Sequence, residues 1–281
     1  MITAENFQSL RATLAGWRKQ GLSIGFVPTM GHLHAGHLSL IERARESCDR
    51  VVVSIFINPL QFNQASDFLA YPKTLSDDEQ KLQAAAVDLL FLPDEKSMYP
   101  EGQQGITRVS VPGISAELEG ACRPGHFDGV ATVVNKLFNL VLPEQAFFGQ
   151  KDYQQLLLIE QMVQDLNIPV QIHSVATCRE ADGLAMSSRN SRLSPELRRI
   201  APKLYASLNG LASQLKQGSI FSQILPAAIA ELESAGFRVE YISLRDTGLQ
   251  ELQQYIKPCV LLAAAWLGEV RLIDNIQLSQ D

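Results

Sequence analysis

The sequence lacks the features that mark secreted, membrane-bound or nucleic-acid-binding proteins. Its four cysteines stand far apart with no C-x-x-C pair, which favours free thiols in a reducing compartment over disulfides or a zinc knuckle. The longest apolar stretch, 260–267, is too short to span a bilayer, and no basic region followed by an apolar run opens the chain. Lysine and arginine are scattered and the net charge is −6. We therefore expect a cytoplasmic protein with neither nucleic acid nor membrane as a partner.

What the sequence does have is the composition of a large folded protein. Hydrophobic residues make up 46% of it and charged residues 19%, which argues against disorder. A length of 281 residues exceeds the usual single core. Two domains, or one extended domain, are expected.

Short buried strands alternate with helices through the first part of the chain. Thr3 is expected to cap the first helix, and Pro28 is expected to end the first strand. Strands are predicted at 23–27, 50–57, 87–92, 146–148 and 170–175, and helices at 3–19, 36–48, 75–86, 130–141 and 153–166. This order predicts an α/β fold with a doubly wound, parallel, Rossmann-like sheet over residues 1–177.

The pattern changes after about Thr177. Ser194 and Pro195 are expected to begin a long helix. A second helix at 221–235 and strands at 238–244, 260–267 and 270–276 follow, and Gly268-Glu269 suits a type II′ hairpin between the last two. We expect a second, smaller α+β C-terminal domain at 178–281.

The most informative segment is the loop 28–37, which follows the first predicted strand. Ligands of open α/β sheets bind at the carboxyl ends of the strands, and the next helix offers unpaired N–H groups to a phosphate. His34 and His37 are three residues apart and face the same way on the first helical turn, and Gly36 lets a nucleotide approach the backbone. Such fixed donors stabilise the charge that develops in phosphoryl transfer.

Two other interpretations of this loop stay open. His32, His34 and His37 are also a set of metal ligands by residue type, although no Cys, Asp or Glu accompanies them in the segment. Alternatively, the histidines only cap the helix.

His34-Ala35-Gly36-His37 resembles the His-x-Gly-His motif of the nucleotidylyltransferase superfamily. The longer segment 26–31 resembles the pantothenate synthetase family in particular. The similarity continues along nearly the whole chain in segments 57–62, 123–130, 148–155 and 186–190.

The resemblance implies an AMP-forming carbon–nitrogen ligase. Pantoate would attack the α-phosphorus of ATP to give pantoyl adenylate and pyrophosphate, and the amine of β-alanine would then displace AMP to give pantothenate. A homodimer and magnesium on the triphosphate are implied as well. The second domain, reached through the loop 186–190, is expected to be a lid that excludes water from the adenylate.

We predict three groups of site residues. Charge stabilisation is assigned to His34, His37, Lys151, Ser187, Ser188 and Arg189. The wider ATP site comprises Met30, Gly31, His32, Leu33, His34, Ala35, Gly36, His37, Gly149, Gln150, Lys151, Asp152, Cys178, Met186, Ser187, Ser188 and Arg189. The substrate site comprises Pro28, Thr29, Asn58, Gln61, Arg123 and Gln155, in which the resemblance assigns the two glutamines to pantoate.

Several of these assignments also follow from the residue types. Asn58 and Gln61 come after the second buried strand, where neutral amides bond a hydroxy acid without adding charge; an Asn-Pro turn explains Asn58 but not Gln61. Lys151 offers a point charge to phosphates, and Asp152 either caps a helix or binds ribose or magnesium.

The segment 186–189 resembles the Lys-Met-Ser-Lys-Ser loop that closes on ATP in the same superfamily. Its two hydroxyls and its guanidinium suit a triphosphate. Ala185 stands where the wider motif has lysine, so charge at the leaving pyrophosphate has to come from Arg189 and Lys151. Taken alone, Ser-Ser-Arg-Asn is an ordinary polar loop.

Two other functions stay open. A simple nucleotidylyltransferase, which transfers AMP to a phosphate, would share the motifs around His34 and Met186 but would not need the amides of Asn58, Gln61 and Gln155. A non-catalytic nucleotide-binding or regulatory module could lose its histidines and Lys151, which are intact here.

Overall fold

The computed structural model describes residues 1–278, except for the side chains of Ala65 and Ser66, and these residues form two compact units. The first unit comprises Met1–Gln150 and Gln154–Ala176. The second comprises Lys151–Tyr153 and the described residues from Thr177 onward. Within residues 1–278, every helix is too short or too polar to cross a bilayer.

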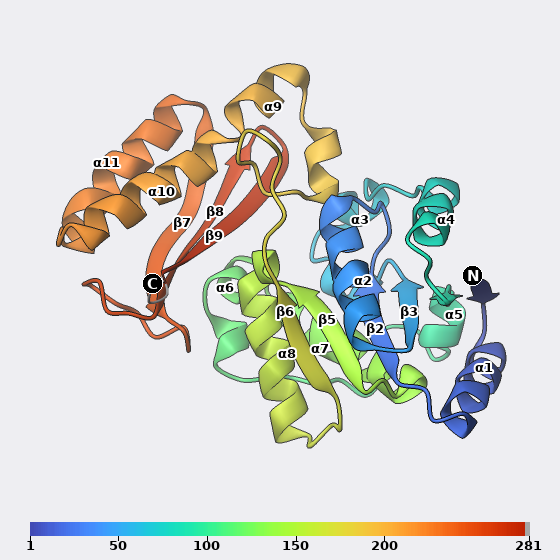
Figure 1. The fold of residues 1–281 in the computed structure, drawn as a ribbon. Helices are drawn as coiled ribbons and strands as arrows, with labels where there is room; N and C mark the ends of the chain where they lie inside the picture. Colours follow the sequence, from blue (N-terminus) through green and yellow to red (C-terminus); the bar gives the residue numbers. More distant parts are fainter. Residues whose placement is uncertain (279–281) are drawn as a thin grey trace. The chain divides into compact units, whose positions relative to one another are not determined.

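The first unit is built on a six-stranded parallel sheet with the order β1-β4-β3-β2-β5-β6 (Figure 1). The strands are β1 (Ile2–Ala4), β2 (Ile24–Thr29), β3 (Arg50–Ile55), β4 (Leu89–Phe91), β5 (Gln145–Gly149) and β6 (Gln171–Val175). From β2 the chain adds strands first on one side and later on the other, so β2 and β5 flank the topological switch point. The predicted doubly wound α/β sheet is confirmed.

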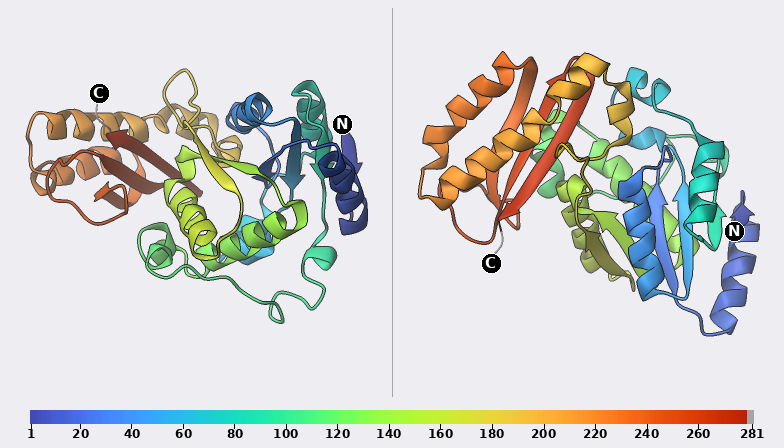
Figure 2. Two further views of the ribbon diagram at one scale, coloured as in Figure 1. Left: turned by 60° about the horizontal axis from the view of Figure 1, so that its bottom comes forward. Right: turned by 45° about the horizontal axis from the view of Figure 1, so that its top comes forward.

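Helices cover both faces of this sheet (Figures 1 and 2). Along this part of the chain lie the helices α1 (Phe7–Lys19), α2 (Ala35–Ser47), α3 (Ala65–Leu69), α4 (Leu75–Ala84), α5 (Glu95–Met98), α6 (Glu119–Cys122), α7 (His126–Val141) and α8 (Tyr153–Asp165), with the 3-10 turns η1 (Pro59–Gln61), η2 (Ile114–Ala116) and η3 (Gln150–Asp152). Residues of α1, α7 and α8 share a core with one face, and residues of α2 and α4 with the other.

Burial on both faces explains why the strands read as continuous apolar runs. In β3, Val52 joins the core with α1, α7 and α8, while Val51 and Val53 join the core with α2 and α4. In β5, Phe148 belongs to the core with α1, α7 and α8, and Phe147 belongs to the core with α2 and α4; both are 5% exposed or less. Each fully buried side chain of this size contributes about 1.5–3 kcal/mol, so the two-sided core holds the strand ends in place.

The predicted cap of the first helix is wrong. Thr3 lies in the strand β1, where it pairs with Leu90, and the helix starts at Phe7. Asn6 caps it, since its side-chain oxygen accepts the N–H of Ser9 at 2.9 Å. A three-residue edge strand is too short to show a period in the sequence. Its conformation is determined by pairing with the neighbouring strand.

Pro28 does not end the first strand, which continues to Thr29. The backbone of Thr29 faces β3, because its carbonyl accepts the N–H of Phe56 at 3.0 Å. Pro28, one residue earlier, faces β5, but β5 pairs with β2 only at Gly25 and Phe26. The missing N–H of the proline therefore removes no ladder bond.

The second unit is a three-stranded antiparallel sheet with the order β7-β8-β9, covered by helices α10 (Lys203–Lys216) and α11 (Phe221–Ser234), which lie side by side in Figure 2. The strands are β7 (Phe237–Asp246), β8 (Cys259–Leu267) and β9 (Val270–Leu278). Gly268 has a φ of 58° and Glu269 does not have a positive φ, as the predicted type II′ hairpin requires. The expected α+β character of this part is confirmed.

The helix predicted to begin at Ser194 and Pro195 starts there but is not long. Ser194 accepts the N–H of Leu197 at 3.3 Å, and α9 (Pro195–Ile200) ends before Pro202. The chain resumes as α10 immediately after this proline. A proline inside a helix removes a backbone donor and clashes with the preceding turn, which divides the predicted helix in two.

Candidate active site

The loop between β2 and α2 is fixed by hydrogen bonds to its backbone. The buried carboxylate of Asp78, on α4, accepts the N–H of His32 at 2.8 Å and that of Leu33 at 2.7 Å. Gly31 and His32 have φ values of 81° and 52°, a conformation that strains residues other than glycine. Thr29 adds a contact of 3.2 Å from the Gly31 N–H to its hydroxyl. These bonds give the loop a defined backbone conformation.

His34 and His37 form a pair at the start of α2. His34 is the N-cap residue, and its Nδ1 accepts the N–H of Gly36 at 3.2 Å. The Nδ1 of His37 accepts the N–H of His34 at 3.3 Å, and the two ring centroids are 4.1 Å apart. Because each Nδ1 acts as an acceptor, the proton of each neutral ring is on Nε2.

Helix capping and donation to a phosphate are compatible roles for these two histidines. The histidines do cap the helix, and the same bonds turn each Nε2 into an N–H donor. His32 is not part of the pair: its Nδ1 lies 3.2 Å from the hydroxyl of Thr74. Across the described residues, no three His, Cys, Asp or Glu side chains are grouped so that they could hold a metal ion.

Asn58 and Gln61 lie just after β3, one on either end of η1, and we call them the amide pair. Asn58 is 1% exposed, and its Nδ2 donates to the Oε1 of Gln61 and to the carbonyl of Gly129, both at 3.1 Å. Its Oδ1 accepts the hydroxyl of Tyr99 at 2.7 Å and the N–H of Leu60 at 3.3 Å. All donors and acceptors of this buried amide are thus satisfied.

Gln61 connects the amide pair to two other predicted site residues. Its Nε2 lies 2.9 Å from the sulfur of Met30. Its backbone carbonyl accepts from Arg123 at 3.2 Å and from the Nδ1 of His126 at 2.8 Å. The Nε2 of His126 lies 3.1 Å from Arg123, which is a donor. The proton of a neutral His126 ring is therefore on Nδ1. The first unit therefore brings Met30, the amide pair and Arg123 into one bonded cluster.

Helix α7 approaches this cluster closely because Gly129 has no side chain. A Cβ added there would lie 2.3 Å from the carbonyl oxygen of Leu60. The same glycine carbonyl accepts from Asn58. Glycine at this position therefore permits the packing that buries the amide pair.

Gln154 and Gln155 have different positions. Gln154 is 3% exposed and donates to the carbonyls of Ile114 and Glu117 at 2.6 and 2.8 Å, while its oxygen accepts the N–H of Glu119 at 3.0 Å. It holds the segment before α7. Gln155, the predicted substrate residue, is partly exposed on α8.

In the second unit, Asn275 on β9 links two predicted segments. Its Nδ2 donates to the carbonyl of Lys151 at 2.9 Å, and its own carbonyl accepts from Arg179 at 3.2 Å. Arg179 is also paired with Asp274 at 2.7 Å and lies 3.5 Å from the ring centre of Tyr205. Asn275 on β9 thus connects the base of the loop that contains segment 186–190 with the backbone of Lys151.

The loop itself is a short hairpin. Arg179 and Ala185 form an antiparallel bridge, and the N–H of Met186 donates to the carbonyl of Cys178 at 3.0 Å. Ser187 caps the turn η4 (Ser188–Arg192), since its hydroxyl accepts the N–H of Arg189 at 3.2 Å. Lys151 lies 3.6 Å from the carboxylate of Asp152.

The predicted site residues are divided between the units. In the first are Pro28, Thr29, Met30, Gly31, His32, Leu33, His34, Ala35, Gly36, His37, Asn58, Gln61, Arg123, Gly149, Gln150 and Gln155; in the second are Lys151, Asp152, Cys178, Met186, Ser187, Ser188 and Arg189. The carboxyl ends of the parallel strands β2, β3 and β5 place the first group at one edge of the sheet.

Sequence reasoning missed three residues that hold this edge: Asp78, Tyr99 and His126. His126 stands inside the segment 123–130 but carried no assigned role. Asp78 and Tyr99 belong to no motif, and their bonds to the loop and to the amide pair arise only in the folded chain. A buried polar side chain between apolar residues is a signal that only burial data reveal.

A family model described as pantoate-beta-alanine ligase matches residues 2–277. The chain is 50% identical over 281 residues to a pantothenate synthetase from Shewanella sp. (strain MR-7), covering 100% of both. It is 52% identical over 278 residues to a pantothenate synthetase from Thioalkalivibrio sulfidiphilus (strain HL-EbGR7), covering 98% of this chain and 97% of the other.

Solved structures agree with these matches. The pantothenate synthetase of Thermus thermophilus superimposes with a TM-score of 0.93 at 46% identity, covering 100% of both chains. A pantoate-beta-alanine ligase from Francisella tularensis, complexed with beta-gamma ATP and beta-alanine, gives a TM-score of 0.84 at 39% identity, covering 99% of this chain and 97% of the other.

Proposed function

Because the chain belongs to the pantoate-beta-alanine ligase family, we propose how its residues carry out that family's reaction. The chain is an enzyme, a ligase that condenses pantoate with β-alanine to pantothenate and converts ATP to AMP and pyrophosphate. The observation that carries this conclusion is the match over residues 2–277. A simple nucleotidylyltransferase is not favoured, since the similarity to the ligases extends beyond the nucleotide motifs to the whole chain.

The reaction needs no nucleophile from the protein. A carboxylate oxygen of pantoate attacks the α-phosphorus, and the bond to pyrophosphate breaks. The amine nitrogen of β-alanine then attacks the acyl carbon, loses a proton, and AMP leaves with the bonding electrons. The residues of the chain hold the reacting atoms in line and stabilise the phosphate charge.

We assign His34, His37 and the first turn of α2 to the phosphates of ATP. Support comes from the Nδ1 bonds that leave each histidine with an Nε2–H donor, and from the partial positive charge of a helix N-terminus. A donor of this kind is worth about 2.7–4 kcal/mol in a transition state. Donors that the fold has already oriented need no rearrangement as charge develops.

We assign the amide pair, Arg123 and Gln155 to pantoate. Support comes from the bonded cluster of Met30, Asn58, Gln61 and Arg123, in which the Nε2 of Gln61 faces a thioether sulfur, a weak acceptor. An N–H donor next to a weak acceptor gains a stronger hydrogen bond when a substrate hydroxyl or carboxylate takes the place of that acceptor. The guanidinium of Arg123 adds one positive charge to the cluster.

Lys151, Ser187, Ser188 and Arg189 are assigned to the triphosphate and to the leaving pyrophosphate. The hairpin closed by Arg179 and Ala185 is bonded to Asn275, which also bonds the backbone of Lys151. These contacts support a defined position for the four side chains. Magnesium fits a site of this kind, because it binds one or two carboxylates together with substrate phosphates. Asp152 is the carboxylate that would hold it, and the ion would neutralise charge on the triphosphate.

Three further proposals follow the family. The enzyme acts in the cytoplasm as a homodimer, which light scattering coupled to size-exclusion chromatography tests. The domain 178–281, after the nucleotide- and pantoate-binding domain 1–177, excludes water from the adenylate. The last proposal predicts little AMP from ATP and pantoate in the absence of β-alanine; AMP release at the full rate without the amine contradicts it.

An omission assay tests the function. The purified chain is given ATP, pantoate and β-alanine, each left out in turn, while pyrophosphate exchange into ATP and AMP release are followed. Exchange that needs pantoate but not β-alanine, with AMP release that needs both, is expected. Exchange without pantoate, or AMP transfer to a phosphate acceptor, contradicts the ligase assignment.

A further inference from the structure

Tyr99 connects the C-terminal end of α5 to the amide pair. Its side chain is buried, with 3% of the residue exposed, and its hydroxyl donates to the Oδ1 of Asn58 at 2.7 Å. Burial raises the pKa of this hydroxyl well above its ordinary value of 10.0, so it stays protonated and donates. None of the segments that resemble the family contains this residue.

The hydroxyl of Tyr99 strengthens one of two orientations of the Asn58 amide, the one that the Gly129 carbonyl and the Leu60 N–H also require. The two N–H groups of Asn58 face the Oε1 of Gln61 and the carbonyl of Gly129, which are both acceptors. In the flipped orientation the Asn58 oxygen would face these two acceptors, and its NH2 would face the hydroxyl. In the observed orientation the Asn58 oxygen accepts both the Tyr99 hydroxyl and the Leu60 N–H.

This orientation is passed on to Gln61. Because the Oε1 of Gln61 accepts from Asn58, its Nε2 is at the opposite end of the amide, 2.9 Å from the sulfur of Met30. Without the Tyr99 hydroxyl, Asn58 would lose the shorter of the two bonds to its oxygen. The Gln61 amide would then have a less strongly determined orientation.

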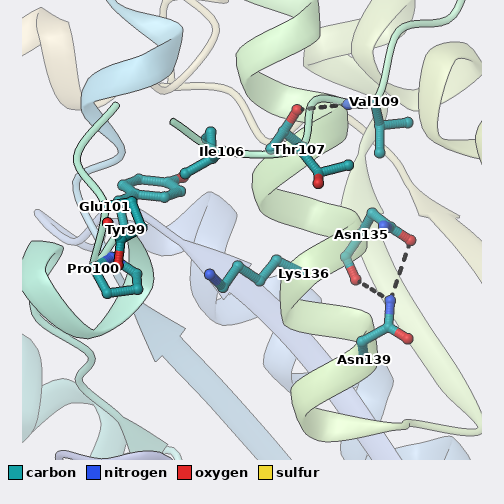
Figure 3. Close-up of a pocket in the computed structure, with 10 residues that line it drawn as sticks. Tyr99, Pro100, Glu101, Ile106, Thr107, Val109, Asn135, Lys136 and Asn139 are labelled. Carbon is teal, nitrogen blue, oxygen red and sulfur yellow. Dashed lines mark hydrogen bonds between the residues drawn. The ribbon is translucent and has the colours of Figure 1, made fainter. Parts of the chain in front are cut away.

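The Tyr99 ring is part of the hydrophobic core of the first unit. The tilted ring of Phe56 packs against it at a centroid distance of 5.9 Å, and the amine of Lys136 lies 5.5 Å from the ring centre and donates to the carbonyl of Met98. A cavity of about 370 Å³ lies beside these groups, with Tyr99 and Lys136 among its lining residues (Figure 3). Because the ring is packed in this core, removal of the hydroxyl alone breaks the bond to Asn58 and leaves the ring in place.

We propose that Tyr99 is a positioning residue for pantoate, which fixes Asn58 and through it presents the N–H donors of Gln61 to the substrate. The inference rests on the role proposed above for Gln61. Tyr99 touches neither substrate nor nucleotide in this account. Its effect passes to Asn58 and reaches the substrate through Gln61.

The substitution Tyr99→Phe removes the hydroxyl and keeps the ring. We expect the KM for pantoate to rise about three- to tenfold, the size of one lost neutral hydrogen bond, while the KM for ATP stays unchanged. Tyr255→Phe is the matched control, because it deletes a buried tyrosine hydroxyl that has no hydrogen-bond partner among the described residues. It should leave both constants as they are. A Tyr99→Phe variant that raises both KM values alike, or neither, overturns the proposal.

A double-mutant cycle separates positioning from a general structural effect. Gln61→Leu should raise the KM for pantoate, and Tyr99→Phe should then add nothing to it, because its route through Gln61 is gone. Additive effects overturn the role of Tyr99 and leave the role of Gln61 intact. If Gln61→Leu does not change the KM for pantoate, the pantoate assignment of Gln61 fails, and this inference fails with it. Thermal unfolding of each variant checks that the chain is folded.

Discussion

The carboxylate of Asp78 accepts the backbone N–H of His32 at 2.8 Å. The other oxygen of the same carboxylate accepts the next N–H along, that of Leu33, at 2.7 Å. This side chain thus holds the loop in front of α2 from a helix outside it, and it is buried to 1% exposure. The positive φ of His32 is retained because this contact stabilises it.

Asp78→Asn should impair use of ATP. An amide has one oxygen, so one of the two backbone donors loses its partner, and the other bond loses its charge. We expect destabilisation of about 1–3 kcal/mol and a higher KM for ATP, measured by denaturant unfolding and steady-state kinetics. Asp77→Asn, an exposed neighbour on the same turn, is the control. Equal effects of the two substitutions would contradict the role of Asp78.

His34→Gln and His37→Gln should each lower kcat by about 10²–10³, as expected for loss of one fixed donor to the phosphate in the transition state. The KM for pantoate should change little. His173→Gln, which alters a histidine on β6 stacked on Phe147, tests whether any loss of a histidine has this effect. Near-normal kcat in either variant of the pair would refute its catalytic assignment.

Gly129→Ala should destabilise the fold, because the new Cβ would lie 2.3 Å from a backbone oxygen that cannot move aside cheaply. We expect a loss of about 3 kcal/mol in the free energy of unfolding, at the upper end of overpacking effects. Gly210→Ala, inside α10 with nothing within 4 Å, should instead stabilise by about 0.5–1 kcal/mol. Urea titration of both variants measures the contrast, and a stable Gly129→Ala enzyme contradicts the packing argument.

Cys48 should resist alkylation. Burial, with smaller contributions from Glu144 and Asp49, raises the pKa of its thiol from 9.0 to about 11, so almost none is thiolate at pH 8. The folded state therefore favours the protonated thiol; this stability is present below pH 9.0 and is lost as pH rises to about 11. Iodoacetamide followed by mass spectrometry should label the exposed Cys122 first. Rapid labelling of Cys48 at pH 8 would contradict the shift.

The alternation of apolar runs and helices was enough to predict the parallel sheet, because Val51-Val52-Val53 is a run that only two-sided burial explains. The ends of strands and helices next to prolines were harder to predict. Pro28 was expected to end a strand, and Pro202 was not expected to divide a helix. In each case the outcome depends on which neighbour the missing N–H would have faced.

For the site, residues that follow a strand in a motif were accessible to sequence reasoning, as with Gln61 and Arg123, which the structure brings into contact. The supporting contacts were not accessible. Asp78 and Tyr99 act on the site through hydrogen bonds from distant parts of the chain, and a single sequence carries no pattern for such pairs.

The central claim is that a carboxylate oxygen of pantoate becomes bonded to the α-phosphorus of ATP. Pantoate labelled with oxygen-18 in its carboxylate, together with ATP and β-alanine, tests it in one turnover. The account predicts that mass spectrometry finds a single labelled oxygen on the phosphate of AMP and none in pyrophosphate. AMP without the label, or label in pyrophosphate, would contradict the adenylate route.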